Sequence, residues 1–229
     1  MTISFIPELP PREHVQEIMA ELQTAIGQMT DVGPAVSVFG SARIRPSSPY
    51  YVKSMAITSA LAKAGFTIIS GGGPGIMEAA SRGAFEAGGQ SVGLNIKLPH
   101  ESTDNVHQTH SLHFRHFSPR KTIFFMYSMA YVVLPGGFGT LDELFEALTL
   151  VQTRKLPPAP IVLVGSEFWS GLIDWMREQL LAESTINPGD LKLFSVEDDP
   201  DRVVELLLAF HRKHPVTALR PPQALASVK

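Results

Sequence analysis

Short apolar runs alternate with longer amphipathic stretches along most of this chain. The runs are rich in β-branched residues, which is typical of strands buried on both faces, and the stretches have the spacing of helices that pack on one side. Strands are predicted at 35–39, 67–70, 90–94, 130–134, 160–164 and 191–194. Helices are predicted at 11–28, 49–64, 76–87, 119–129, 140–151, 168–181 and 200–211. This order predicts an α/β fold in which a parallel sheet is covered by helices on both faces.

Three parts of the chain stand apart from this pattern. Residues 1–30 are expected to form a helical extension ahead of a single domain at 31–213. Residues 95–118 show no clear periodicity, and an irregular segment of that length is expected to be functional or mobile. The proline-containing tail at 214–229 is expected to be disordered.

The composition excludes several kinds of chemistry. The chain of 229 residues has a formal net charge of -3, which argues against a broad nucleic-acid-binding surface. It contains no cysteine, which excludes disulfides, thiolate catalysis and iron–sulfur clusters. No apolar run reaches the roughly 20 residues of a membrane span, and the N-terminus lacks a basic or apolar leader. A cytoplasmic protein without a membrane partner is the expectation.

Ligands of open parallel sheets bind outside the carboxyl ends of the strands, and three predicted strands here end in glycine. The first ends in Gly40-Ser41-Ala42-Arg43. Ser41 can donate to a phosphate or sugar oxygen, and Arg43 can pair with an anion. A Gly-Ser pair after a strand is also ordinary turn chemistry, and that alternative stays open.

The second strand end places Gly71, Gly72, Gly73 and Gly75 within five positions. Such a run is unfavourable in chain entropy unless the backbone must approach another group closely. It matches neither the G-x-G-x-x-G fingerprint nor the lysine-containing phosphate loop, which disfavours a nicotinamide dinucleotide and ATP-driven phosphoryl transfer. Glu78, in the first turn of the next helix, either complements the helix dipole or binds ribose hydroxyls. The candidate binding residues are Gly72, Gly73 and Glu78.

The third strand end, at residues 135–143, combines a glycine turn with the start of a helix. Unpaired N–H groups and the helix dipole favour an anion there, and glycines let a phosphate approach. Thr140 and Glu143 also match a capping box with Thr140 as the N-cap, which would explain both residues but not the three glycines. The candidate phosphate ligands are Gly136, Gly137, Gly139 and Thr140.

Two cations, Arg120 and Lys121, lie in the first turn of a helix predicted to start with Ser118 as N-cap and Pro119 at the next position. A helix dipole disfavours cations in this turn, which suggests that the pair faces a bound anion. For Lys121, a side chain that reaches solvent is the alternative. The following residues, 123–129, are apolar nearly all round and are predicted to be buried.

Five histidines lie in the irregular segment, but their spacing matches no recognised zinc site. A solvated or ligand-contacting loop is therefore expected there, without a metal. These residues are His100, His107, His110, His113 and His116.

Taken together, residues 71–80, 119–121 and 135–143 resemble the Lonely Guy family of cytokinin-activating phosphoribohydrolases, whose members were often labelled lysine decarboxylases. The resemblance implies a Rossmann-like, doubly wound parallel sheet flanked by helices, assembled as a homodimer or higher oligomer. It also implies hydrolysis of the N-glycosidic bond of a nucleoside 5′-monophosphate such as AMP, without a cofactor. Carried over residue by residue, Arg120 and Glu143 match the catalytic pair, and the turn from Gly136 to Thr140 matches the phosphate site.

The residues are consistent with this chemistry. Glycosidic cleavage passes through an oxocarbenium-like transition state. A carboxylate such as Glu143 can stabilise the charge of that state or activate the attacking water. Arg120 would hold or polarise the nucleotide. Lys121 beside it is poorly placed for a pyridoxal-phosphate Schiff base, so decarboxylation is not expected. The competing hypothesis is a non-catalytic nucleotide or molybdenum-cofactor carrier of the same fold, which needs the glycine turns but not the pair.

Overall fold

The computed structural model describes residues 10–97 and 105–213, and within them seven strands form one parallel sheet. The predicted tail at 214–229 and His100 lie outside the described residues. The strands are β1 (Ala35–Phe39), β2 (Thr67–Ser70), β3 (Ser91–Ile96), β4 (His110–Phe114), β5 (Ser128–Val133), β6 (Ile161–Leu163) and β7 (Ser195–Val196). The α-helices are α1 (Pro11–Gln28), α2 (Pro49–Lys63), α3 (Ile76–Glu86), α4 (Phe117–Tyr127), α5 (Phe138–Gln152), α6 (Ser166–Trp175) and α7 (Pro200–Lys213). A π-helical segment η1 (Met176–Leu181) continues α6, and a 3-10 turn η2 (Asp190–Lys192) precedes β7.

The strand order is β4-β3-β2-β1-β5-β6-β7, and every neighbouring pair is parallel. The sheet starts at the central strand β1, from which the chain winds outward to β4, returns to β5 and winds outward again to β7. This is a doubly wound, Rossmann-like α/β fold, as predicted. The order reverses between β1 and β5, which is where such sheets bind ligands.

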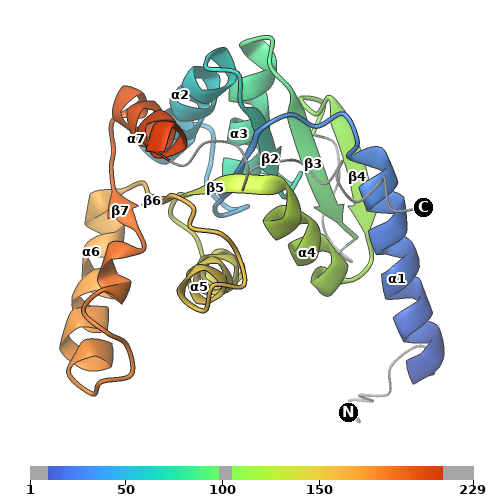
Figure 1. Ribbon diagram of the computed structural model, residues 1–229. Helices are drawn as coiled ribbons and strands as arrows, with labels where there is room; N and C mark the ends of the chain where they lie inside the picture. Colours follow the sequence, from blue (N-terminus) through green and yellow to red (C-terminus); the bar gives the residue numbers. More distant parts are fainter. Residues whose placement is uncertain (1–9, 98–104, 214–229) are drawn as a thin grey trace, which may run out of the picture.

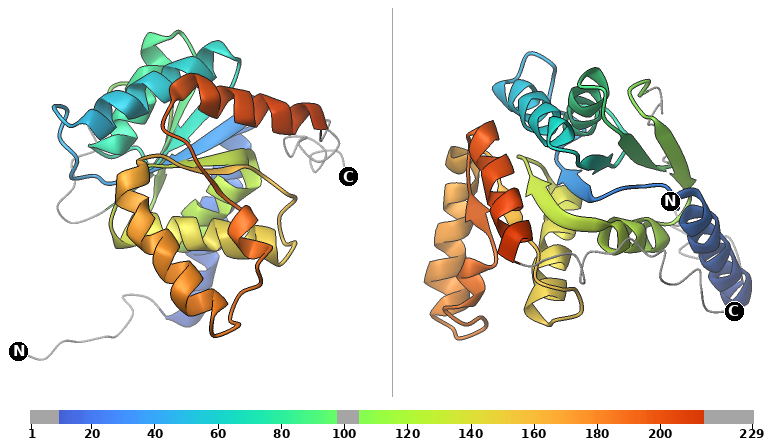
Figure 2. Two further views of the ribbon diagram at one scale, coloured as in Figure 1. Left: turned by 90° about the vertical axis from the view of Figure 1, so that its left-hand side faces the viewer. Right: turned by 45° about the horizontal axis from the view of Figure 1, so that its top comes forward.

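Helices cover both faces of the sheet (Figures 1 and 2). α2, α3 and α7 pack on one face, where Ile57, Ile76 and Val203 belong to one apolar core. α1, α4, α5 and α6 pack on the other, where Phe124 and Trp169 belong to a second core. Side chains alternate between the faces along a strand, so β1 contributes to both cores although all of its residues are buried.

Helix α1 packs against the β4 edge of the sheet and against α4 (Figure 1). Its Ala25, together with Met29 just after its end, joins the core beneath the sheet. Within 10–97 and 105–213, no helix has the length and apolar character needed to cross a membrane.

The prediction of an irregular segment at 95–118 is wrong for its second half, because β4 occupies His110–Phe114 and pairs along β3. As an edge strand, β4 alternates exposed and buried residues, and its exposed positions are the polar Ser111 and His113. The sequence there lacks the continuous apolar run that marks the central strands. The last strand is also displaced: residues 190–192 form η2, and the pairing residues are Ser195 and Val196.

Candidate active site

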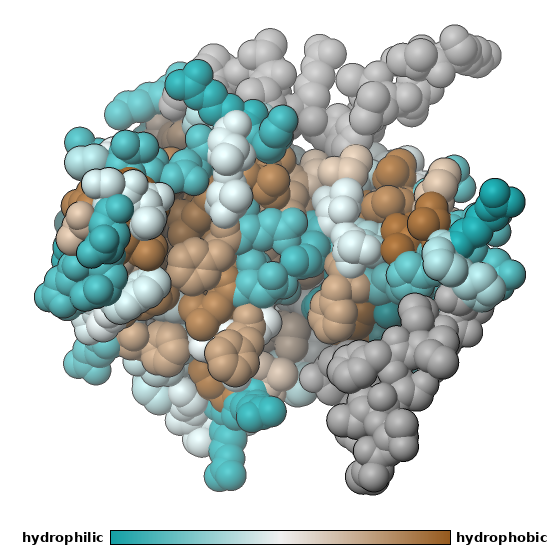
Figure 3. Space-filling model, turned by 90° about the horizontal axis from the view of Figure 1, so that it is seen from below, coloured by the Kyte–Doolittle hydropathy of each residue, from teal (hydrophilic) through white to brown (hydrophobic). Residues whose placement is uncertain are grey.

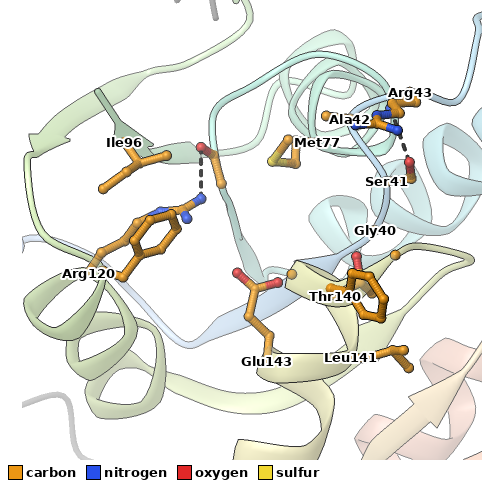
Figure 4. Close-up of a pocket in the computed structure, with 15 residues that line it drawn as sticks. Gly40, Ser41, Ala42, Arg43, Met77, Ile96, Arg120, Thr140, Leu141 and Glu143 are labelled. Carbon is orange, nitrogen blue, oxygen red and sulfur yellow. Dashed lines mark hydrogen bonds between the residues drawn. The ribbon is translucent and has the colours of Figure 1, made fainter. Parts of the chain in front are cut away.

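A pocket of about 570 Å³ opens beside the point where the strand order reverses. Its walls come from residues at or just after the ends of β1, β2 and β3, and from the first turns of α4 and α5 (Figure 4). The three glycine-bearing strand ends therefore do meet at one edge of the sheet. The pocket lies where open parallel sheets bind ligands.

Arg120 forms one side of this pocket and is only 6% exposed. Its Nε donates to the Leu94 carbonyl at 2.7 Å and its Nη2 to the Gly71 carbonyl at 3.3 Å. The guanidinium also lies over the Phe124 ring, 5.4 Å from the centroid. A Cβ at Gly71 would overlap Nη2 of Arg120, so a glycine is required here for the cation to approach. The side chain is held by main-chain oxygens from two strand ends.

Glu143 lies across the pocket in the second turn of α5, and its carboxylate points into the cavity (Figure 4). Burial raises the pKa of this carboxyl to about 7, although the positive charge of Arg120 acts in the opposite direction. A carboxyl with a pKa near neutrality exchanges a proton readily at physiological pH. Glu143 therefore has the properties of a general base beside a fixed cation.

The glycine turn differs from the predicted capping box. α5 begins at Phe138 with Gly137 as its N-cap residue, and no side chain caps it. Thr140 is therefore inside the first turn, 5% exposed, and not at the N-cap. Gly136 makes room for it, since a Cβ at Gly136 would overlap Thr140 Oγ1. Glu143 has no capping role in this geometry, which leaves its carboxylate available to the pocket.

The first turn of α5 supplies the side of the pocket suited to an anion. Residues 137–140 line the cavity. The first N–H groups of a helix have no acceptor within it, and the dipole adds partial positive charge there. This combination can hold a phosphate without a lysine.

The predicted binding residues divide into two groups. Those that line the pocket with Arg120 and Glu143 are Ser41, Gly137, Gly139 and Thr140. The described residues that do not line it are Gly72, Gly73, Glu78, Lys121 and Gly136. The Ser41 hydroxyl accepts a hydrogen bond from the Arg43 N–H at 3.0 Å, so it shapes the turn after β1 as well as facing the pocket.

Lys121 lies next to Arg120 in sequence but has different surroundings. Its Nζ is 3.0 Å from Asp142 Oδ2 and 2.7 Å from Glu146 Oε2 on α5. It lines a second hollow between α4 and α5. Glu78, in the first turn of α3, is half-buried and near Tyr51 of α2, whose pKa is raised by burial and by the charge of Glu78.

Several apolar residues that line the pocket were not among the predicted site residues. Met77 and Phe138 lie within the glycine motifs themselves, so their position beside the strand ends was a usable signal. Ile96 and Phe117 lie in the segment predicted to be irregular, where the sequence gives no such signal. They make part of the cavity wall apolar.

Among the histidines within the described residues, His116 packs against α1, whereas the ring of His107 lies near that of Phe85 on α3. Nδ1 of His116 is 3.2 Å from Oε1 of Glu21, and its ring meets that of His14 edge-on, with centroids 4.6 Å apart. In residues 10–97 and 105–213, no three His, Asp or Glu side chains are grouped to hold a metal ion. α4 begins at Phe117 with His116 at its N-cap position, so the prediction of Ser118 as N-cap is wrong.

The fold and this pocket together define a Rossmann-like α/β protein with its site at the topological switch point. A family model described as "Possible lysine decarboxylase" matches residues 77–207, which include both Arg120 and Glu143. The chain therefore belongs to this family, which is that of the Lonely Guy proteins.

Curated relatives carry phosphoribohydrolase names. The cytokinin riboside 5′-monophosphate phosphoribohydrolase of Mycobacterium tuberculosis is 33% identical over 62% of this chain and 77% of its own length. The probable enzyme of the same name, LOGL5, from Oryza sativa is 33% identical over 52% of this chain. That match spans 49%, about half, of the rice protein.

Solved structures with this fold include a molybdenum cofactor carrier. The carrier protein MCP from Chlamydomonas reinhardtii superimposes with a TM-score of 0.53 at 25% identity. The match covers 77% of this chain and 98% of that one.

Proposed function

We propose that this protein hydrolyses the N-glycosidic bond of a nucleoside 5′-monophosphate and releases the free base and ribose 5-phosphate. The observation that carries the proposal is a carboxylate, Glu143, with a pKa raised by burial to about 7, facing a buried, anchored Arg120 across a pocket. The phosphoribohydrolase names of the relatives support the same reaction.

The proposed reaction assigns one role to each side of the pocket. The bond between C1′ and the base nitrogen breaks with its electrons passing to the base, and a water oxygen bonds to C1′. Glu143 stabilises the positive charge that develops on the sugar and takes a proton from the attacking water. The proton lost by water balances the one gained by the departing base.

The first turn of α5 holds the 5′-phosphate in this scheme. N–H groups of residues 138–140 and the Thr140 hydroxyl are its donors, and Arg120 orients the ribose or phosphate oxygens. Binding energy from the unreacting phosphate then fixes C1′ beside Glu143. AMP and its prenylated, cytokinin-type derivatives are the proposed substrates. The family resemblance further supports a homodimer or higher oligomer.

A direct assay separates this proposal from a binding role. The protein is incubated with AMP or prenylated AMP, and free base is measured by chromatography. Glu143→Ala and Arg120→Ala are each expected to lower base release by about a thousandfold, since each removes charge stabilisation at the transition state. Glu146→Ala, on the same helix but paired with Lys121, is the matched control and should retain activity.

The second candidate function is that of a carrier. The likeness to the molybdenum cofactor carrier of Chlamydomonas favours it. A carrier needs the glycine turns but not a carboxylate with a pKa near 7 opposite an arginine. Binding of AMP without base release by the unsubstituted protein would favour the carrier over the hydrolase.

A further inference from the structure

Two side-chain amides behind the pocket form a reciprocal pair. Gln108 Nε2 donates to Asn95 Oδ1 at 3.3 Å, and Asn95 Nδ2 donates to Gln108 Oε1 at 3.1 Å. Gln108 Nε2 also donates to the Gly72 carbonyl at 2.9 Å. The Gln108 amide nitrogen thus donates two hydrogen bonds, and its carbonyl oxygen accepts one from Asn95. Asn95 is 2% exposed at the end of β3.

Two glycines leave the space that this pair occupies. A Cβ at Gly72 would overlap Asn95 Oδ1, and a Cβ at Gly93 would overlap the Gln108 amide. Gly72 also has φ +76°, a conformation that favours glycine. The glycine at position 72, which does not line the pocket, is therefore explained by its contact with the amide pair.

The amide pair binds or includes the residue that follows each main-chain anchor of Arg120. The guanidinium donates to the carbonyls of Gly71 and Leu94. The next residue after Gly71 is Gly72, which Gln108 binds, and the next after Leu94 is Asn95. The pair therefore ties together the two strand ends on which the arginine rests.

We propose that Gln108, acting with Asn95, is a positioning residue that fixes the guanidinium of Arg120 opposite Glu143. Gln108 itself is a described residue that does not line the pocket, so it acts through the arginine and not on the substrate. The catalytic part of this inference rests on the proposed hydrolase function. The positioning part rests on the hydrogen bonds alone.

This role has a consequence that a purely structural contact would lack. The charge of Arg120 lowers the pKa of Glu143, against the larger effect of burial. A guanidinium that is less firmly held no longer keeps its charge at a fixed distance from Glu143, so the pKa of that carboxyl shifts. The change is measurable in the free protein, without substrate.

The test uses Gln108→Met, which keeps the length of the side chain but cannot form the three hydrogen bonds. The pKa of Glu143 is measured by NMR of the protein carrying carbon-13 at the glutamate carboxyl, with Glu143→Gln identifying the signal. We expect the pKa to shift by about half a pH unit and kcat for base release from AMP to fall about tenfold, with KM changed less. Ser111→Ala removes one acceptor of Asn95 at 2.9 Å but leaves the bond to Gly72, and should move neither quantity.

Far-UV circular dichroism and thermal melting check that the variant is folded, and Gln108→Ala replaces it if it is not. An unchanged Glu143 pKa in the folded variant would overturn the positioning role. A shifted pKa in a protein whose unsubstituted form releases no base would support the positioning role and count against the hydrolase instead. A fall in kcat with the Glu143 pKa unmoved would mean that Gln108 acts by some route other than Arg120.

Discussion

At the scale of single residues, Arg120 and Lys121 show how neighbours on one helix acquire different roles. Successive helical side chains point about 100° apart, so two adjacent cations cannot both face one pocket. Arg120 is buried against Leu94 and Gly71, whereas Lys121 pairs with Asp142 and Glu146. Desolvation acts against the charge of Lys121, but these partners outweigh it, so its pKa is raised and it stays cationic.

Replacing Arg120 by lysine tests the importance of the guanidinium geometry. A lysine ammonium keeps the charge but cannot reproduce the planar fork that reaches both carbonyls. Arg120→Lys is expected to lower kcat/KM for base release from AMP by about a hundredfold, because the cation is misplaced. Lys121→Ala is the matched control and should change kcat/KM less than about threefold, since its partners lie on the exposed side of α5. Equal losses in the two variants would contradict the assignment of the site to Arg120.

The resemblance to a family singled out Arg120 and Glu143, which we propose as the catalytic pair, but the sequence did not show the reason for each glycine. Gly71 admits Arg120, Gly72 admits the Asn95 amide and Gly136 admits Thr140. The first two requirements depend on side chains distant in sequence, so a local pattern indicates a close approach without naming the partner. The local sequence also allowed a capping box with Thr140 as the N-cap. The structure excludes it, because α5 begins at Phe138 with Gly137 at the N-cap position.

At the scale of elements, the central strands and most helices were predictable because each repeats one strong pattern. β1, β2 and α1 have the predicted bounds. β4 was missed because an edge strand is buried on one side only, and β7 was predicted a few residues too early because its pairing covers only two residues. The change from α-helix to π-helix at Met176 likewise could not be predicted from the spacing of the apolar residues.

The junction of β7 and α6 depends on one carboxylate. Asp198 accepts hydrogen bonds from the Gly165 N–H at 2.6 Å and from the Ser166 hydroxyl at 2.7 Å, and it pairs with Lys53 at 3.0 Å. Burial alone would raise the pKa of Asp198, but these contacts outweigh it and hold the pKa well below its ordinary value. Asp198 therefore caps the start of α6 from a different part of the chain.

Removing this cap should destabilise the protein. Asp198→Ala is expected to lower the free energy of unfolding by about 1–2 kcal/mol at pH 7, as for other lost caps. Because the folded pKa is depressed, the contribution is complete above the unfolded value of 3.8 and is lost as the pH falls below it. Urea unfolding should show that the difference in free energy of unfolding between wild type and Asp198→Ala becomes smaller below pH 4. Asp174→Ala, which removes an exposed ion pair with Arg177, should change stability by less than about 0.5 kcal/mol.

At the scale of the whole molecule, the site is assembled from segments that lie far apart in the chain. Its residues lie at or just after the ends of β1, β2 and β3 and near the starts of α3, α4 and α5, so the pocket exists only when these segments pack together. The surface on the side of α4, α5 and α6 carries apolar patches among polar ones (Figure 3). Large apolar residues exposed on these helices include Phe117, Phe138, Phe168 and Trp175. Apolar exposure of this kind is typical of surfaces that bind ligands or other chains.

The half-buried carboxylate of Glu143 should also make the stability of the whole fold depend on pH. The pKa of Glu143 is about 7 in the folded protein, above its ordinary value of 4.5. Between these two pH values the folded state holds a proton that the unfolded state has released, so stability falls as the pH rises and levels off above pH 7. The loss from this one group amounts to about 3 kcal/mol for a shift of this size.

Glu143→Gln removes that pH dependence, because glutamine resembles the protonated acid and does not titrate. The variant should match wild type in free energy of unfolding near pH 4.5 and exceed it by about 3 kcal/mol at pH 8, although its base release is abolished. Urea unfolding monitored across this range measures the difference directly. Glu146→Gln, on the same helix and outside the pocket, provides the comparison for a carboxylate paired with lysine. A constant difference between wild type and Glu143→Gln at all pH values would contradict the raised pKa, and with it the proposed use of Glu143 as a base near neutral pH.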